Sequence, residues 1–155
     1  MDARGVVPDA QWKMDAYGEH WYQGDVAQMS IGQGMLLTTP MHMALVAGAI
    51  GTGRLVTPRL KRDLAAEFSP LPFTERQLGV VREGMFMAVN GDGTRRGTGW
   101  RAGEGVPVKV CGKTGTAQIY RNGKIEANLH IGSFVGFAPA DDPQVAFAGL
   151  VEYGH

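Results

Sequence analysis

Apolar and polar positions alternate in the last third of the chain, and this pattern predicts three β-strands. A valine recurs at every second position from Val106 to Val110 and leads into a strand that continues to Tyr120. Further apolar runs at 131–138 and 145–151 predict two more strands. Turn-forming residues separate the three runs, namely Asn122-Gly123 and Asp141-Asp142-Pro143. Because the connections are short, we expect an antiparallel meander.

Capping residues and helical periodicity predict two helices upstream of this sheet. Thr39 is a suitable N-cap for a helix that begins with Pro40 and runs to about Ile50. A second helix is predicted to begin at Thr74, where Gln77 completes a capping box. Its apolar face is predicted to comprise Leu78, Val81, Met85, Ala88 and Val89. Helices packed on an antiparallel sheet give an α+β fold class.

The remaining segments lack a sustained period. Residues 1–38 are rich in glycine and aromatic residues and are predicted to form ordered loops and short turns. Residues 59–72 and 90–105 are predicted connectors. Within the second helix, Gly79 and Gly84 each cost ~1 kcal/mol relative to alanine, which is tolerable if a neighbour packs closely against them.

Composition describes an ordinary globular chain and excludes several functions. Of the 155 residues, 44% are hydrophobic and 19% charged, which favours one domain with a real core over disorder. Lys+Arg and Asp+Glu both total 15, and a formal net charge of zero predicts no nucleic-acid partner. The single cysteine, Cys111, is predicted to be a packed, inert strand residue. The histidines lack metal-ligand spacing, so no metal or other cofactor is predicted.

A short stretch of the first predicted strand gathers groups that suit an anionic ligand. Lys113 offers a positive charge, and the hydroxyls of Thr114 and Thr116 lie beside it in sequence. Gly115 has no Cβ, so another chain can approach the backbone closely there. Together these residues predict a peptide-like anion bound along a strand edge. A phosphate-binding loop is the alternative, but it requires a glycine where Pro107 stands and a helix after the threonine.

Three segments resemble one enzyme family. The run Gly112-Lys113-Thr114-Gly115-Thr116-Ala117-Gln118 resembles the Lys-Thr-Gly motif of penicillin-binding proteins and serine β-lactamases, and its full form is similar to the class B penicillin-binding proteins. Ser30-Ile31-Gly32-Gln33-Gly34, followed by Thr38-Thr39-Pro40, resembles a segment of elongation-type penicillin-binding protein 2. The run 133–143 is similar to the family's next strand and turn. The segments keep the family's order, so residues 1–155 resemble the C-terminal portion of one transpeptidase domain.

Two other motifs of that family are absent from the sequence. Its nucleophile lies in Ser-x-x-Lys and its second motif is Ser-x-Asn, but the three serines Ser30, Ser69 and Ser133 fit neither pattern. In the family both motifs lie upstream of the segments found here. We therefore expect the part of the domain that carries them to lie outside residues 1–155, together with the last segment of the domain. The resemblance then implies an enzyme fragment that is inactive alone. The alternative is a non-catalytic truncated relative that binds wall peptide or a protein partner.

The resemblance also implies a reaction, a site and a location. The family comprises peptidoglycan D,D-transpeptidases, which are serine-type acyltransferases that cross-link wall stem peptides and bind penicillin and other β-lactams. By this resemblance Lys113 and Thr116 are catalytic, and Thr114, Gly115 and Thr116 bind substrate, with the Thr116 backbone N–H as an oxyanion donor. It further implies an extracytoplasmic location, periplasmic or at the outer face of the inner membrane, with a membrane anchor outside this chain and a wall-elongation complex as partner.

Overall fold

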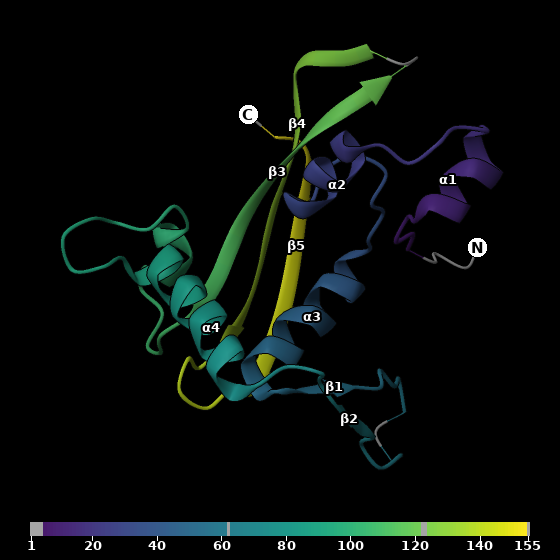
Figure 1. The fold of residues 1–155 in the computed structure, drawn as a ribbon. Coiled ribbons are helices and arrows are strands. Elements are labelled where there is room, and N and C mark those ends of the chain that lie inside the picture. Colours follow the sequence, from purple (N-terminus) through teal and green to yellow (C-terminus); the bar gives the residue numbers. More distant parts are fainter. Residues whose placement is uncertain (1–4, 62, 122–123, 155) are drawn as a thin grey trace. The chain divides into compact units, whose positions relative to one another are not determined.

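The computed structural model describes residues 5–61, 63–121 and 124–154. Helices and an antiparallel sheet make up an α+β fold, as predicted (Figure 1). The chain divides into two compact units, of which the first ends at His42 and the second begins at Met43. Within the described residues, no helix is both long and apolar enough to cross a membrane.

The first unit contains two short helices where the sequence predicted only loops and turns. These are α1, Ala10–Tyr17, and α2, Gln23–Ser30. Asp9 caps α1, because its carboxylate accepts a hydrogen bond from a backbone N–H of the first turn at 2.7 Å. Lys13 is only 5% exposed, and its ammonium donates to Asp25 of α2 at 2.8 Å. Apart from Lys13 no residue of either helix is buried, so hydrophobic periodicity could not reveal them.

The second unit is built on a three-stranded antiparallel sheet in the order β3-β4-β5, which confirms the predicted meander. The strands are β3, Cys111–Arg121, β4, Lys124–Ala138, and β5, Val145–Gly154. Because β3 begins at Cys111, the predicted strand character of 106–110 is wrong. Pro107 within that stretch cannot donate to a ladder, and Val106 and Val108 remain exposed.

The strands β3 and β4 extend as one long hairpin. β4 begins at Lys124 rather than at Ile131, since the pairing continues outward to Tyr120 with Ile125 and Arg121 with Lys124. The ladder shifts register between Gln118 and Tyr120, which interrupts the simple alternation that the prediction relied on. The predicted Asn122-Gly123 turn lies outside the described residues.

Both predicted helices are present and begin where their capping residues predict. These are α3, Pro40–Thr52, and α4, Glu75–Asn90. The Thr39 hydroxyl accepts the His42 backbone N–H at 3.2 Å, and Thr74 and Gln77 form the predicted capping box. A two-stranded sheet joins β1, Arg54–Val56, to β2, Phe68–Pro70, and β2 falls in a segment predicted as connector. Trp100–Gly103 forms one 3₁₀ turn, η1.

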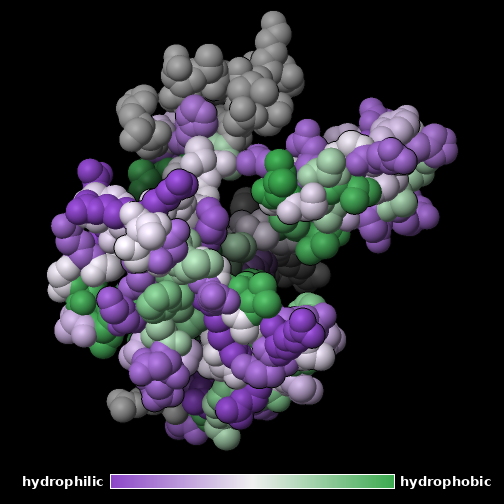
Figure 2. All heavy atoms as spheres, turned by 60° about the vertical axis from the view of Figure 1, so that its left-hand side comes forward, coloured by the Kyte–Doolittle hydropathy of each residue, from purple (hydrophilic) through white to green (hydrophobic). Residues whose placement is uncertain are grey.

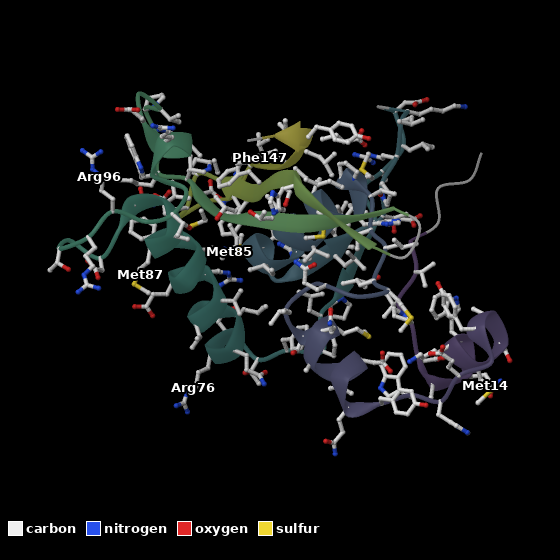
Figure 3. The ribbon with its side chains drawn as sticks, turned by 90° about the horizontal axis from the view of Figure 1, so that it is seen from above. Met14, Arg76, Met85, Met87, Arg96 and Phe147 are labelled. Carbon is white, nitrogen blue, oxygen red and sulfur yellow. The ribbon has the colours of Figure 1, made fainter. Side chains whose placement is uncertain are left out.

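The core of the second unit lies where the helices meet the sheet. Met85 of α4, Cys111 of β3 and Phe137 of β4 form its buried cluster, and Ile50 of α3 packs against them. Figure 3 shows Met85 directed from α4 toward the strands and Met87 directed away from them. Cys111 is 2% exposed and burial raises the pKa of its thiol, as expected of an inert strand residue.

The α4 surface differs from its prediction at three positions. Leu78, Met85 and Val89 are buried as predicted, whereas Val81 is 45% exposed. Gly79 and Gly84 have no heavy atom within 4 Å of the position that a Cβ would occupy. No described neighbour therefore packs closely enough to require either glycine, which contradicts the predicted reason for their presence.

Candidate functional site

The Lys-Thr-Gly run lies on β3, which forms one edge of the described sheet. It pairs with β4 as Lys113 with Val135, Thr114 with Phe134, Gly115 with Ser133 and Thr116 with Gly132. Because successive side chains of a strand point to opposite faces, Lys113 shares the face of buried Cys111. Thr114 and Thr116 occupy the other face. The strand edge thus carries an ammonium group on one face and two hydroxyls on the other.

The Lys113 side chain is exposed and turns back onto its own strand. Its Nζ donates to the backbone carbonyl of Thr114 at 2.7 Å. Backbone groups of alternate residues in an antiparallel strand point to the same side. The N–H of Thr116 and the carbonyl of Thr114 therefore lie on one side of β3, so a charge, a carbonyl and an N–H are close together there.

Gly115 lies opposite Ser133 in the β3–β4 ladder, a neighbour that the sequence did not reveal. A Cβ at this position would lie 2.4 Å from Oγ of Ser133 on the neighbouring strand. The next nearest atom is Cβ of Ser133 at 3.8 Å, so an alanine here would require the exposed Ser133 hydroxyl to change its rotamer. The absence of a side chain at position 115 therefore leaves room for the Ser133 hydroxyl, and the close approach of a ligand remains a prediction.

Thr98 lies beside the predicted site, and the sequence reasoning missed it. The Thr114 hydroxyl donates to Oγ1 of Thr98 at 3.2 Å, across sixteen positions of sequence. Thr98 lies in the Gly-rich connector, where its only sequence signal is a Gly97-Thr98-Gly99 run without strand or helix periodicity. The structure thus brings one connector residue to the four consecutive residues of the predicted site.

The connector before Thr98 is held by a carboxylate-centred turn. Asp92 accepts hydrogen bonds from the backbone N–H groups of Thr94 and Arg95 and from the Thr94 hydroxyl, at 2.7–2.8 Å. These bonds favour the charged carboxylate and lower the pKa of Asp92 to about 2. Arg96 then covers the ring of Trp100 at 4.3 Å from its centroid and is labelled in Figure 3. The connector is therefore an ordered segment on both sides of Thr98.

Metal-binding groups do not gather at this site. Across the ranges that the structure describes, no group of three or more His, Cys, Asp or Glu side chains could hold a metal ion. His130 is half-buried and lies opposite Gln118 in the β3–β4 ladder. The chemistry available at the β3 edge is therefore that of one ammonium, hydroxyls and backbone amides.

This chain is similar to known proteins of one family. The family model described as penicillin binding protein transpeptidase domain matches residues 4–155. A peptidoglycan D,D-transpeptidase, MrdA of Acinetobacter baumannii, is 32% identical, with 99% of this chain and 25% of the relative covered.

Two solved structures of the Helicobacter pylori penicillin-binding protein PBP2 are similar in fold. One has a TM-score of 0.80 at 28% identity, covering 97% of this chain and 27% of that one. The other, a complex with MreC, has a TM-score of 0.79 at 30% identity with the same coverage. The chain thus spans about a quarter of the length of the relatives that it matches. Since the family model covers nearly all of the sequence, the chain belongs to the penicillin-binding protein transpeptidase domain family.

Proposed function

We propose that this chain is part of a peptidoglycan D,D-transpeptidase and supplies the strand that receives the substrate's terminal carboxylate. The observation that supports this most directly is the exposed Lys113 ammonium on an edge strand beside Thr114. The ammonium and the hydroxyls of Thr114 and Thr116 are donors for a carboxylate, each worth ~1.5–3 kcal/mol when the bond is charge-assisted. The family membership supplies the reaction.

In the proposed reaction a serine outside this chain attacks the carbonyl between two D-alanines of a stem peptide. The terminal D-alanine leaves, and an amine of a second stem takes the acyl group from the serine. The N–H of Thr116 is proposed as one donor to the tetrahedral oxyanion. Loss of one such donor typically costs ~2.7–4 kcal/mol of transition-state stabilisation. The other donor and the nucleophile belong to the upstream part of the domain.

We also propose a setting for the whole protein. The relatives named MrdA are peptidoglycan D,D-transpeptidases, and the H. pylori PBP2 was solved in complex with MreC. The whole protein is then membrane-anchored, works outside the cytoplasm and joins a wall-elongation complex. A pull-down of the membrane-extracted protein with its MreC-type partner tests this assignment, and failure to recover the pair would contradict it.

The assay for the proposed reaction is covalent labelling by a fluorescent penicillin. In the longer protein that carries the upstream Ser-x-x-Lys, Lys113→Ala should slow acylation about 10- to 150-fold, as the loss of one charge-assisted bond predicts. Lys109→Ala is the matched control, because it removes an exposed lysine four residues away without touching the Thr114 carbonyl. Equal labelling of wild type and Lys113→Ala would refute the role of this strand.

The alternative function is a non-catalytic module that binds wall peptide. It is favoured by one observation, the absence of Ser-x-x-Lys from the sequence. Intact-mass measurement of residues 1–155 with penicillin should show no adduct under either proposal. A gene in which no Ser-x-x-Lys lies upstream, together with measurable binding of stem peptide by this chain, would establish the binding module.

A further inference from the structure

The glycines on both sides of Thr98 hold this segment against the C-terminal end of α4. The Gly99 N–H donates to the Ala88 carbonyl at 2.8 Å. A Cβ at Gly97 would lie 2.2 Å from the same carbonyl oxygen, so that backbone approaches α4 as closely as a glycine allows. A Cβ at Gly99 would lie 3.0 Å from the Phe134 ring of β4. Thr98 is therefore placed by backbone contacts to α4 and by the sheet beneath it.

The Thr98 hydroxyl is in hydrogen-bond contact with one of the proposed carboxylate donors. Thr114 Oγ1 lies 3.2 Å from Thr98 Oγ1. A hydroxyl has one proton and can accept as well as donate, whereas an ionised carboxylate only accepts. In the structure, the Thr114 proton has Thr98 as its acceptor. When a carboxylate arrives, the Thr114 proton must turn to it, and the Thr98 hydroxyl can then reverse and donate to Thr114.

We propose that Thr98 is a positioning residue that orients the Thr114 hydroxyl toward the substrate's carboxylate. This inference rests on the proposed function of the β3 edge. Thr98 acts through Thr114 and does not itself contact the ligand. After that reversal Thr98 is the donor, and its bond polarises the Thr114 hydroxyl and strengthens the bond from Thr114 to the carboxylate. The α4 C-terminus and the connector thereby take part in substrate recognition.

The test compares Thr98→Val with Thr98→Ser in the longer, penicillin-reactive protein. Valine keeps the shape of threonine but removes the hydroxyl, and the expected result is a weaker apparent binding constant by about three- to tenfold, the effect of one neutral hydrogen bond. The limiting rate of acylation should change less than the binding constant. Thr98→Ser should keep wild-type binding. Thr98→Ala is the second variant if valine prevents folding, which circular dichroism and thermal unfolding will detect.

Two further measurements distinguish the positioning of the Thr114 hydroxyl by Thr98 from a general disturbance of the Gly-rich connector. Thr98→Val should add no further loss to Thr114→Val, because the two hydroxyls act as one unit. The preference for a penicillin over its carboxylate methyl ester should fall in Thr98→Val. Thr94→Val is the matched control, since its hydroxyl contacts Asp92 and not the strand, and it should keep that preference. Independent, additive losses or an unchanged acid-to-ester preference would overturn the inference.

Lys113→Ala, measured in parallel, separates a failure of the proposed function of β3 from a failure of the positioning role of Thr98. If Lys113→Ala impairs labelling while Thr98→Val behaves as wild type, the positioning role is wrong and the proposed function stands. If Lys113→Ala labels at the wild-type rate, the proposed function fails and the role of Thr98 fails with it. Reduced binding in both variants, with rescue by Thr98→Ser, supports both.

Discussion

Alanine at two positions of α4 should stabilise the protein. Gly79 and Gly84 are interior residues of a 16-residue helix, and neither has a positive φ. A Cβ at either position meets no heavy atom within 4 Å, so it introduces no clash. Glycine costs a helix interior ~1 kcal/mol relative to alanine, mainly because it loses more backbone freedom on folding. We therefore expect each substitution to raise the free energy of unfolding by about 1 kcal/mol.

Urea unfolding followed by circular dichroism measures this change. The double variant should raise the unfolding midpoint without changing the m-value, and its melting temperature should rise by roughly 2–4 °C for each 1 kcal/mol. Gly51→Ala is the matched control on α3, because a Cβ there would lie 3.0 Å from the Phe137 ring and 3.2 Å from Pro143, and it should destabilise. If Gly79→Ala or Gly84→Ala destabilises instead, the helix surface packs against a partner and the reasoning from open space is refuted.

Two more predictions follow from the site. Gly115→Ala should destabilise the protein only slightly, because the exposed Ser133 hydroxyl can rotate away from the new Cβ, and adding Ser133→Gly should remove that loss; thermal unfolding of the single and double variants checks this, and a large loss that Ser133→Gly does not relieve would contradict it. Asp92 has a pKa lowered from 3.8 to about 2, so its contribution to stability is present above pH 3.8 and is lost as pH falls through about 2. The melting-temperature difference between wild type and Asp92→Asn should therefore shrink over that pH range, and a constant difference would refute the role of the charge.

Local signals in the sequence predicted the elements whose formation depends on local chemistry. The starts of α3 and α4 follow from Thr39, Pro40, Thr74 and Gln77, whose side chains and ring act on their own helix turn. The order of the three strands follows from short connections. The β2 strand of three residues could not be predicted, because it depends on pairing with β1 across a loop rather than on its own pattern.

In the site too, features that depend on neighbouring residues in the sequence could be predicted, whereas contacts between distant segments could not. Residues 113–116 resemble a family motif, and this resemblance predicted their chemistry. The structure places them on β3. Thr98 could not be predicted, because its contact with Thr114 requires the Ala88 carbonyl of α4 to hold the connector. The contact that a Cβ at position 115 would make likewise depends on the β3–β4 register, which places Ser133 opposite it.

Some apolar side chains of the described residues are exposed to solvent, and this exposure affects the solubility expected of the chain. Figure 2 shows apolar residues among the polar surface, and on β5 Val145 is 60% and Val151 63% exposed. Monomeric soluble proteins rarely expose large contiguous apolar patches, because such patches favour association with other molecules. We therefore expect this chain to be most soluble when the rest of the domain that its relatives possess is present.

The contact that Lys113 makes in the structure is consistent with the anion-binding role that we propose for it. Its ammonium now donates to a neutral carbonyl, that of Thr114, at 2.7 Å. This bond already has one charged partner and contributes ~1.5–3 kcal/mol. A carboxylate adds an opposite charge, and with it an attraction that the neutral carbonyl lacks. A carboxylate entering beside β3 can therefore displace the carbonyl and gain free energy, while an ester or amide gains little. The bond to the Thr114 carbonyl keeps the ammonium near the strand, so the proposed preference for anionic ligands does not require a second charged residue to hold Lys113 in place.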